Sequence, residues 1–110
     1  MALRNDMNWQ TRAADFAQKQ NLHRSPSVYA LDLVSEIGET AKEILMGMDY
    51  GERPFQPTSN LAGELGDALY SLCQLATAAN IDLEDAFTAV LAKYEQRWQT
   101  KQHIGSMNAE

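Results

Sequence analysis

Two short acidic pairs are the residues in this chain whose type and spacing could do chemistry. Glu36 and Glu39 form the first pair, and Glu64 and Asp67 form the second. Residues three apart share a face of an α-helix, so each pair would project two carboxylates from one side of its helix. Two such helices facing each other would gather four hard oxygen donors, the ligands that Mg²⁺ prefers. The spacing therefore predicts a magnesium site, provided that both segments are helices.

The apolar residues support that condition, because they recur three and four apart along most of the chain. This period predicts four helices, at about 6–20, 26–48, 60–79 and 83–101. Ser25 followed by Pro26 is a typical helix start, and Thr58 or Ser59 is expected to cap the third helix. Glycine, prolines and polar residues between 48 and 60 indicate a loop.

No segment shows the alternation of a β-strand, so the sequence predicts an all-α fold. Connections this short favour antiparallel neighbours, which makes an antiparallel four-helix bundle the expected architecture. We expect a single domain over residues 1–102. Residues 103–110 lack any periodicity and are expected to form a flexible tail.

The bulk composition excludes several classes of function. The chain has 110 residues, a mass of 12.3 kDa, a formal net charge of -6 and a pI near 4.8. Such an acidic chain lacks the basic stripe that binding to nucleic acid needs, and no stretch approaches the roughly 20 apolar residues of a membrane span. Cys73, the single cysteine, has helical spacing from Leu69 and Ala76, which predicts a packed core thiol. We expect a cytoplasmic protein.

The two acidic segments differ in how their carboxylates lie relative to the apolar stripe. Glu64 and Asp67 fall beside the leucine stripe of the third helix without a Lys or Arg on that side, which a purely structural helix would tend to avoid. Glu36 and Glu39, with Glu43, fall largely opposite the apolar stripe of their helix. They are therefore either a solvated face or a face that another subunit covers.

Three glycines lie inside the predicted helices, where each costs roughly 1 kcal/mol relative to alanine. Gly38, Gly63 and Gly66 all adjoin or interrupt an acidic pair. They indicate either close packing between helices or room for a ligand beside the carboxylates.

With SEIGE at 35–39 and GELGDALYSL at 63–72, the chain resembles the MazG-type, all-α nucleoside triphosphate pyrophosphohydrolases. The hallmark of that family is an ExxE pair on one helix and an ExxD pair on the next, and the resemblance covers roughly residues 25–98. It implies a hydrolase that converts a nucleoside triphosphate, ribo or deoxyribo, into the monophosphate and pyrophosphate, a reaction that can serve nucleotide-pool house-cleaning.

The resemblance also implies roles for particular residues. Glu36, Glu39, Glu64 and Asp67 are expected to bind Mg²⁺, for which Mn²⁺ can substitute, and Glu36 or Glu39 is expected to act as the catalytic base. Lys93 and Arg97 match basic residues that contact phosphates in the family. Members often carry a further Glu before each pair, where this chain has Ser35 and Gly63, so the number of metal ions and the general base stay open.

Two other functions remain as alternatives. The first is a phosphoribosyl-ATP pyrophosphohydrolase, a related helical enzyme with a similar acidic arrangement. The second is a helical interaction or regulatory module without catalysis, which would not bind magnesium.

A nucleotide base would need an aromatic or polar lining, which several residues near helix ends or in the loop could supply: Trp9, Phe16, His23, Tyr50 and Phe55. The spacing of Trp9 and Phe16 is more typical of core residues. Because a second subunit is the natural cover for the carboxylates of 36 and 39, we expect a homodimer or homotetramer that associates through helix faces, with its sites near subunit contacts.

Overall fold

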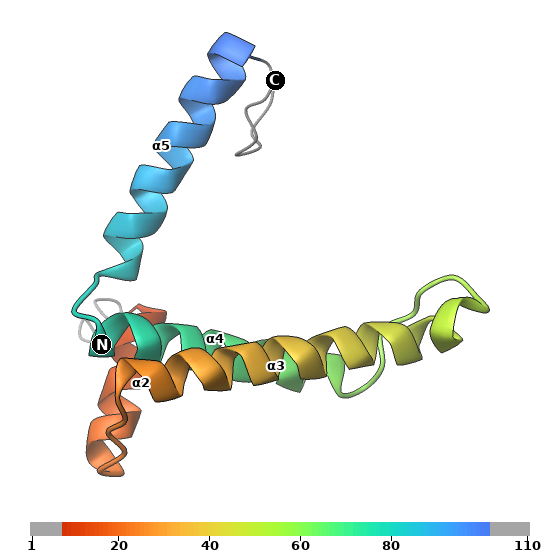
Figure 1. The fold of residues 1–110 in the computed structure, drawn as a ribbon, viewed down its shortest axis with the longest axis horizontal. Helices are drawn as coiled ribbons and strands as arrows, with labels where there is room; N and C mark the ends of the chain where they lie inside the picture. The colour runs from red at the N-terminus through yellow and green to blue at the C-terminus, as the bar shows by residue number, and fades with distance from the viewer. Residues whose placement is uncertain (1–7, 102–110) are drawn as a thin grey trace, which may run out of the picture. The chain divides into compact units, whose positions relative to one another are not determined.

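The computed structural model describes residues 8–101, and all regular structure in this range is helical (Figure 1). The elements are α2 (Trp9–Lys19), α3 (Pro26–Gly47), the short 3₁₀ helix η1 (Asp49–Gly51), α4 (Leu61–Ala78) and α5 (Leu83–Lys101). The predicted all-α class is confirmed. The tail predicted at 103–110 lies outside the described residues. Between residues 8 and 101, no helix is long and apolar enough to cross a membrane.

Side-chain caps start α2 and α3, and the cap of α3 lies at the predicted place. The side chain of Asn8 accepts a hydrogen bond from Thr11 N at 2.9 Å and starts α2. Ser25 accepts from Val28 N at 3.4 Å and starts α3, with Pro26 in its first turn. The prediction that Thr58 or Ser59 caps α4 is wrong. Asn60 occupies the cap position and makes no side-chain capping bond. The Thr58 hydroxyl donates to Glu43 Oε1 instead of capping the helix.

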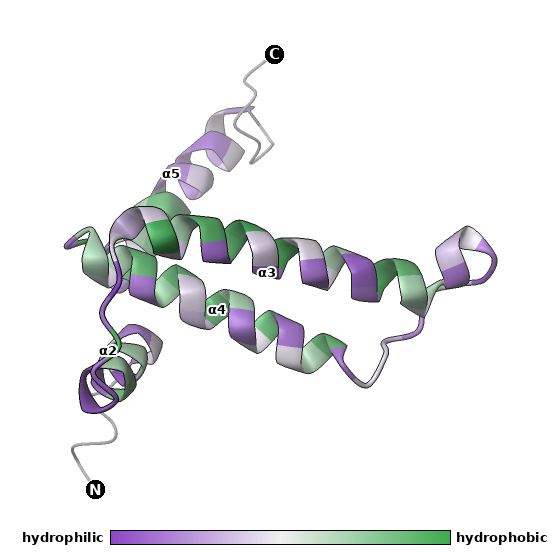
Figure 2. Cartoon of the chain, turned by 60° about the horizontal axis from the view of Figure 1, so that its bottom comes forward, coloured by the Kyte–Doolittle hydropathy of each residue, from purple (hydrophilic) through white to green (hydrophobic). Residues whose placement is uncertain are grey.

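The chain divides into two compact units, Met1–Asn80 and Ile81–Glu110, and each is described by itself. In the first unit, α3 and α4 run antiparallel and side by side, and α2 crosses them and packs on α4 (Figure 2). A left-handed turn at Asp49, Tyr50 and Gly51, with φ values of 49°, 55° and 97°, begins the connection that returns the chain from α3 to α4.

The interior between α3 and α4 is unusually polar. Tyr29, Glu43 and Gly47 are the buried residues of α3, and Ser71 and Gln74 are buried on α4 beside Cys73. Gln74 Nε2 donates to Tyr29 Oη at 3.2 Å, and Tyr29 Oη donates to the carbonyl of Leu22 at 3.4 Å. The Tyr29 hydroxyl and the Gln74 amide nitrogen therefore have partners, as groups removed from water require. Gln74 Oε1 is the exception among the described residues, because it is buried without a hydrogen-bond partner.

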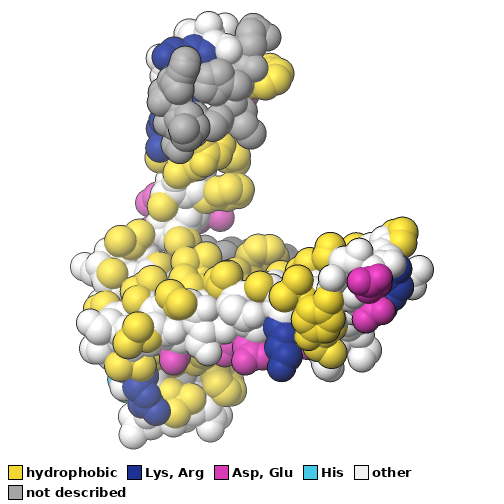
Figure 3. Space-filling view, turned by 45° about the vertical axis from the view of Figure 1, so that its right-hand side comes forward, with side chains coloured by type: hydrophobic (Ala, Val, Ile, Leu, Met, Phe, Trp, Pro, Cys, Tyr) yellow, Lys and Arg dark blue, Asp and Glu magenta, His cyan; other side chains and the backbone are white. Residues whose placement is uncertain are grey.

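The apolar stripe of α3 faces away from the interior of the first unit and is exposed. Leu31, Val34 and Ile37 are 71%, 68% and 54% exposed. Figure 3 shows hydrophobic side chains gathered along one face of the first unit, with acidic side chains along its edge. The usual rule that the apolar stripe of a helix turns inward fails for α3 within this unit.

The second unit contains α5, which starts after Asp82, whose Oδ1 accepts from Asp85 N at 3.0 Å. Among the described residues, α5 buries none of its side chains, and it exposes Phe87, Leu91 and Trp98. The prediction of one domain over 1–102 therefore stays a prediction.

Candidate active site

The acidic pairs meet where α3 and α4 lie side by side. One carboxylate oxygen from each of Glu36, Glu64 and Asp67 lies within 4.8 Å of the others. Two oxygens on opposite sides of one Mg²⁺ are about 4.2 Å apart, so small side-chain adjustments would let all three bind a single ion. The three hard, anionic donors therefore fit a divalent metal, and we call them the acidic cluster.

Together with burial, the crowding of negative charge in the acidic cluster shifts the pKa of Glu64. Partial burial raises the pKa of its carboxyl above the ordinary value, and the charges of Glu39, Asp67, Glu36 and Glu43 raise it further. Within residues 8–101, no lysine or arginine charge is among the causes that shift this pKa. A bound divalent cation would reverse it, because a cation favours the ionised form of a carboxyl group.

Glu39, the fourth predicted ligand, is placed differently from the other three. Its side chain is exposed, and it does not belong to the acidic cluster. It still lies close enough to Glu64 to contribute the largest charge effect on the pKa of that residue. Of the four predicted ligands, the structure brings three together and leaves Glu39 beside them.

Glu43 lies one turn after Glu39 on α3, and its side chain is buried, with 6% of the residue surface exposed. Its carboxyl accepts the hydrogen bond from Thr58, which ties the loop before α4 to α3. The face of α3 that carries Glu36 and Glu43 thus contacts α4 and its preceding loop in the same chain. At Glu43 the cover comes from the same chain, whereas Glu39 stays exposed, so the expectation that a second subunit covers this face stays a prediction.

The helical glycines beside the acidic pairs do not serve close packing. A Cβ placed on Gly38, Gly63 or Gly66 would meet no atom within 4 Å, apart from the immediate backbone. Gly47 is the contrasting case, because a Cβ there would lie 2.5 Å from the carbonyl oxygen of Gln56 and 2.7 Å from the Phe55 ring. Of the two explanations for Gly38, Gly63 and Gly66, the structure favours open space.

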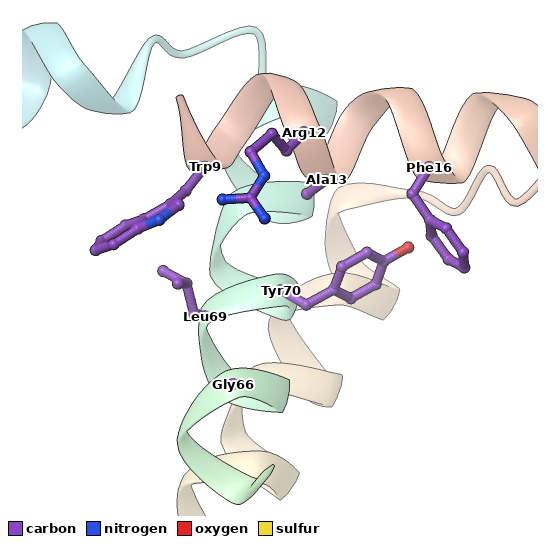
Figure 4. A pocket seen from close by; sticks show the side chains of 7 residues that line it. All are labelled: Trp9, Arg12, Ala13, Phe16, Gly66, Leu69 and Tyr70. Carbon is purple, nitrogen blue, oxygen red and sulfur yellow. The ribbon is translucent and has the colours of Figure 1, made fainter. Parts of the chain in front are cut away.

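An open pocket of about 400 Å³ lies on the other side of α4, against α2 (Figure 4). Four residues of α2 and three of α4 line it: Trp9, Arg12, Ala13, Phe16, Gly66, Leu69 and Tyr70. Trp9 and Phe16 are 65% and 51% exposed, so the prediction that they are core residues is wrong. Phe16 contacts Tyr70 edge to face, with ring centroids 6.1 Å apart.

The sequence contained a signal for this pocket that periodicity alone does not interpret. Residues 9, 12, 13 and 16 share one helix face, and that face combines two aromatic rings with a cation. A stripe built for the core would not carry an arginine at its centre.

The remaining predicted site residues lie elsewhere. Lys93 and Arg97 are on α5, in the second unit, so their approach to phosphates stays a prediction. Phe55 packs against Gly47, and Tyr50 is exposed in η1. His23 lines a smaller pocket of about 230 Å³ with Arg24, Tyr29 and Gln74. Cys73 is 1% exposed, and its burial raises the pKa of the thiol, which confirms the predicted core role.

These features define a class: an all-α domain in which two antiparallel helices present convergent carboxylates suited to a divalent metal. Residues 24–101 match the family model of the MazG nucleotide pyrophosphohydrolase domain. The chain therefore belongs to the MazG nucleotide pyrophosphohydrolase family.

A relative is the uncharacterized protein YpjD of Bacillus subtilis (strain 168). The two sequences are 34% identical over 85 residues, which cover 71% of this chain and 75% of YpjD. No solved structure matches the chain significantly.

Proposed function

We propose that this protein is a Mg²⁺-dependent nucleoside triphosphate pyrophosphohydrolase that converts a ribo- or deoxyribonucleoside triphosphate into the monophosphate and pyrophosphate. The observation that carries the proposal is the convergence of Glu36, Glu64 and Asp67 from two helices onto one spot. Membership of the MazG family supplies the reaction class. The donor set consists of hard carboxylate oxygens, which suits Mg²⁺ or Mn²⁺ rather than a softer metal.

The three residues of the acidic cluster would hold the metal. When bound, the metal would neutralise triphosphate charge and lower the pKa of a water molecule. The reaction needs a water oxygen to attack the α-phosphorus while the α–β bridging oxygen leaves with pyrophosphate. Because carboxylates repel phosphate, the cluster would act by holding the cation, and proton acceptance falls to a carboxylate that the metal does not occupy.

Glu39 is our first candidate for that base. It lies outside the acidic cluster, it is exposed to solvent, and its charge acts strongly on Glu64. A carboxylate in this position can accept a proton from water and release it to solvent. Glu36 is the second candidate, since it shares the face and is only partly exposed.

Lys93 and Arg97 are proposed to bind the phosphates of the substrate. They lie four apart on α5 and can therefore act from one helix face. Arg97 is the better suited of the two for a bidentate contact with phosphate.

A pyrophosphate-release assay with magnesium across natural and oxidised triphosphates tests the proposal. Glu39→Gln is expected to reduce turnover by about 10²–10⁴-fold, as removal of a general base does. Asp67→Asn should abolish both magnesium binding in calorimetry and turnover, with an intact helical circular dichroism spectrum. Glu52→Gln, an exposed carboxylate in the loop, is the matched control and should keep wild-type activity. Retained turnover in both test variants would contradict the assignment.

A further inference from the structure

We infer that the pocket between α2 and α4 binds the base of the nucleotide, and that it selects a 6-oxopurine such as guanine or hypoxanthine. The inference rests on the proposed function, because it assigns a substrate class to the same site. It draws on three observations: the aromatic lining, the guanidinium of Arg12 and the position of the pocket on α4.

The pocket has the size and lining that a planar base requires. Its volume of about 400 Å³ lies within the usual range for small-molecule sites. Trp9, Phe16 and Tyr70 bring three aromatic rings to it, and Leu69 adds an apolar surface. Aromatic rings stack on any base, so this lining accounts for binding but not for a choice among bases.

Exposure of the two aromatic residues on α2 supports a ligand-binding role. Trp9 keeps 65% and Phe16 keeps 51% of its surface in contact with solvent. Figure 4 shows the Trp9 ring at one end of the pocket and the Tyr70 ring extending toward Phe16 at the other. Large aromatic side chains left exposed beside a pocket gain burial when a planar ligand enters.

Arg12 supplies the selectivity. It is the cation that lines the pocket, and its guanidinium points toward α4 between Trp9 and Tyr70 (Figure 4). Among the salt bridges and hydrogen bonds of residues 8–101, none occupies this guanidinium. Arginine only donates, and its paired donors match the O6 and N7 acceptors of guanine and hypoxanthine. Adenine and cytosine present an amino group at the corresponding edge, which an arginine cannot accept from.

The pocket and the acidic cluster share one turn of α4. Gly66 lines the pocket, and the next residue, Asp67, belongs to the cluster. One turn of α4 thus presents a carboxylate toward α3 and an open, side-chain-free floor toward α2. The missing Cβ of Gly66 leaves space that a base can use, since nothing lies within 4 Å of it.

The test uses Trp9 as its reporter. The chain has two tryptophans, so a Trp98→Phe background leaves Trp9 as the single one. Titration with inosine monophosphate is expected to quench Trp9 fluorescence without magnesium. Adenosine monophosphate, which differs at the 6-position of the base, should bind about 10-fold or more weakly. Equal affinity for the two nucleotides would overturn the inference.

Two variants separate the roles of the pocket residues. Arg12→Met keeps the apolar stem and removes the donors, so it should erase the preference for inosine monophosphate. Lys19→Met, on the same helix but outside the pocket, is the matched control. Gly66→Leu fills the floor and should weaken both nucleotides. Ribose 5-phosphate, a probe without a base, should bind wild type and Arg12→Met with the same affinity. If Arg12→Met weakens this probe as much as it weakens inosine monophosphate, Arg12 binds the phosphate instead, and the inference is overturned.

Pyrophosphate release from nucleoside triphosphates distinguishes failure of this inference from failure of the proposed function. If no nucleoside triphosphate is hydrolysed but inosine monophosphate still binds selectively, the proposed function fails and the base pocket stands. If triphosphates are hydrolysed but Arg12→Met leaves base selectivity unchanged, the base pocket fails and the proposed function stands.

Discussion

Glu64 carries the clearest electrostatic signature of function at the scale of single residues. It belongs to the acidic cluster with Glu36 and Asp67, and neighbouring negative charge adds to partial burial in raising the pKa of its carboxyl. A carboxylate that served only stability would be expected to lie apart from other carboxylates or to pair with a cationic side chain. The strain in this arrangement is explained if a divalent cation completes it.

This raised pKa predicts how stability depends on pH in the absence of metal. The folded protein holds the Glu64 proton to higher pH than the unfolded chain, whose carboxyl keeps its ordinary pKa near 4.5. The contribution of Glu64 to stability is therefore present below that ordinary value and is lost as the pH rises through the raised pKa. Glu64→Gln removes this loss, so without metal it should melt at a higher temperature than wild type at about pH 7.5.

Thermal unfolding with a chelator, followed at about pH 4 and about pH 7.5, measures the effect. The melting temperatures of wild type and Glu64→Gln should differ less at the lower pH. Added Mg²⁺ should stabilise wild type and leave the variant unchanged. A variant that is less stable than wild type at the higher pH without metal would contradict the prediction.

The orientation of α3 is the main result at the scale of elements. Its polar face, with Tyr29, Glu36 and Glu43, contacts α4, and its apolar stripe is exposed. The contact between the two helices therefore combines small buried residues of α4, such as Ala68 and Ala76, with the hydrogen bond from Gln74 to Tyr29. The bond from Thr58 to Glu43 matters because it closes the connection that returns the chain to α4.

Loss of that bond should destabilise the protein. Thr58→Val keeps the shape of the side chain and leaves the buried carboxyl of Glu43 without the hydroxyl donor. We expect the free energy of unfolding to fall by about 1–3 kcal/mol, measured by urea denaturation. Ser59→Ala, at the adjacent exposed position, should change it by less than about 0.5 kcal/mol. Equal effects of the two substitutions would contradict the assigned role of Thr58.

Two glycines of α3 should respond to alanine in opposite directions. Gly38→Ala adds a methyl group into open space and is expected to stabilise the helix by about 0.5–1 kcal/mol. Gly47→Ala would bring its methyl group against the Gln56 carbonyl and the Phe55 ring, so it should destabilise. Urea denaturation of both variants provides the comparison. A stabilised Gly47→Ala protein would show that the loop can move away at little cost.

At the scale of the whole molecule, the exposed stripe of α3 bears on assembly. Leu31, Val34 and Ile37 lie along one helix face with Leu45, and large apolar patches of this kind mark interaction sites. We propose a second copy of the chain as the partner, because an apolar helix face can pack against the same face of a second copy about a two-fold axis. The proposal agrees with the homodimer or homotetramer predicted from the sequence but assigns it to the apolar face.

Sedimentation at micromolar concentration tests this assembly. The wild-type chain should sediment as a dimer or larger species, and Val34→Glu should shift it toward the monomer by burying an unpaired charge in the contact. Asp32→Asn, a polar position on the same helix, is the control and should leave the assembly unchanged. A wild-type chain that is strictly monomeric would contradict the proposal.

Local features of this protein can be predicted from its residues alone. Apolar residues three and four apart define the helices, and the spacing of Glu36, Glu39, Glu64 and Asp67 places each pair on one helix face, because both depend only on the geometry of a single helix. The tertiary structure decided which faces meet. It turned the polar face of α3 toward α4, set Glu39 beside the acidic cluster, and left Trp9 and Phe16 exposed in a pocket with Arg12. Which faces meet depends on contacts between residues distant in the sequence, such as the hydrogen bonds of Tyr29 with Gln74 and of Glu43 with Thr58, and no periodicity encodes such contacts.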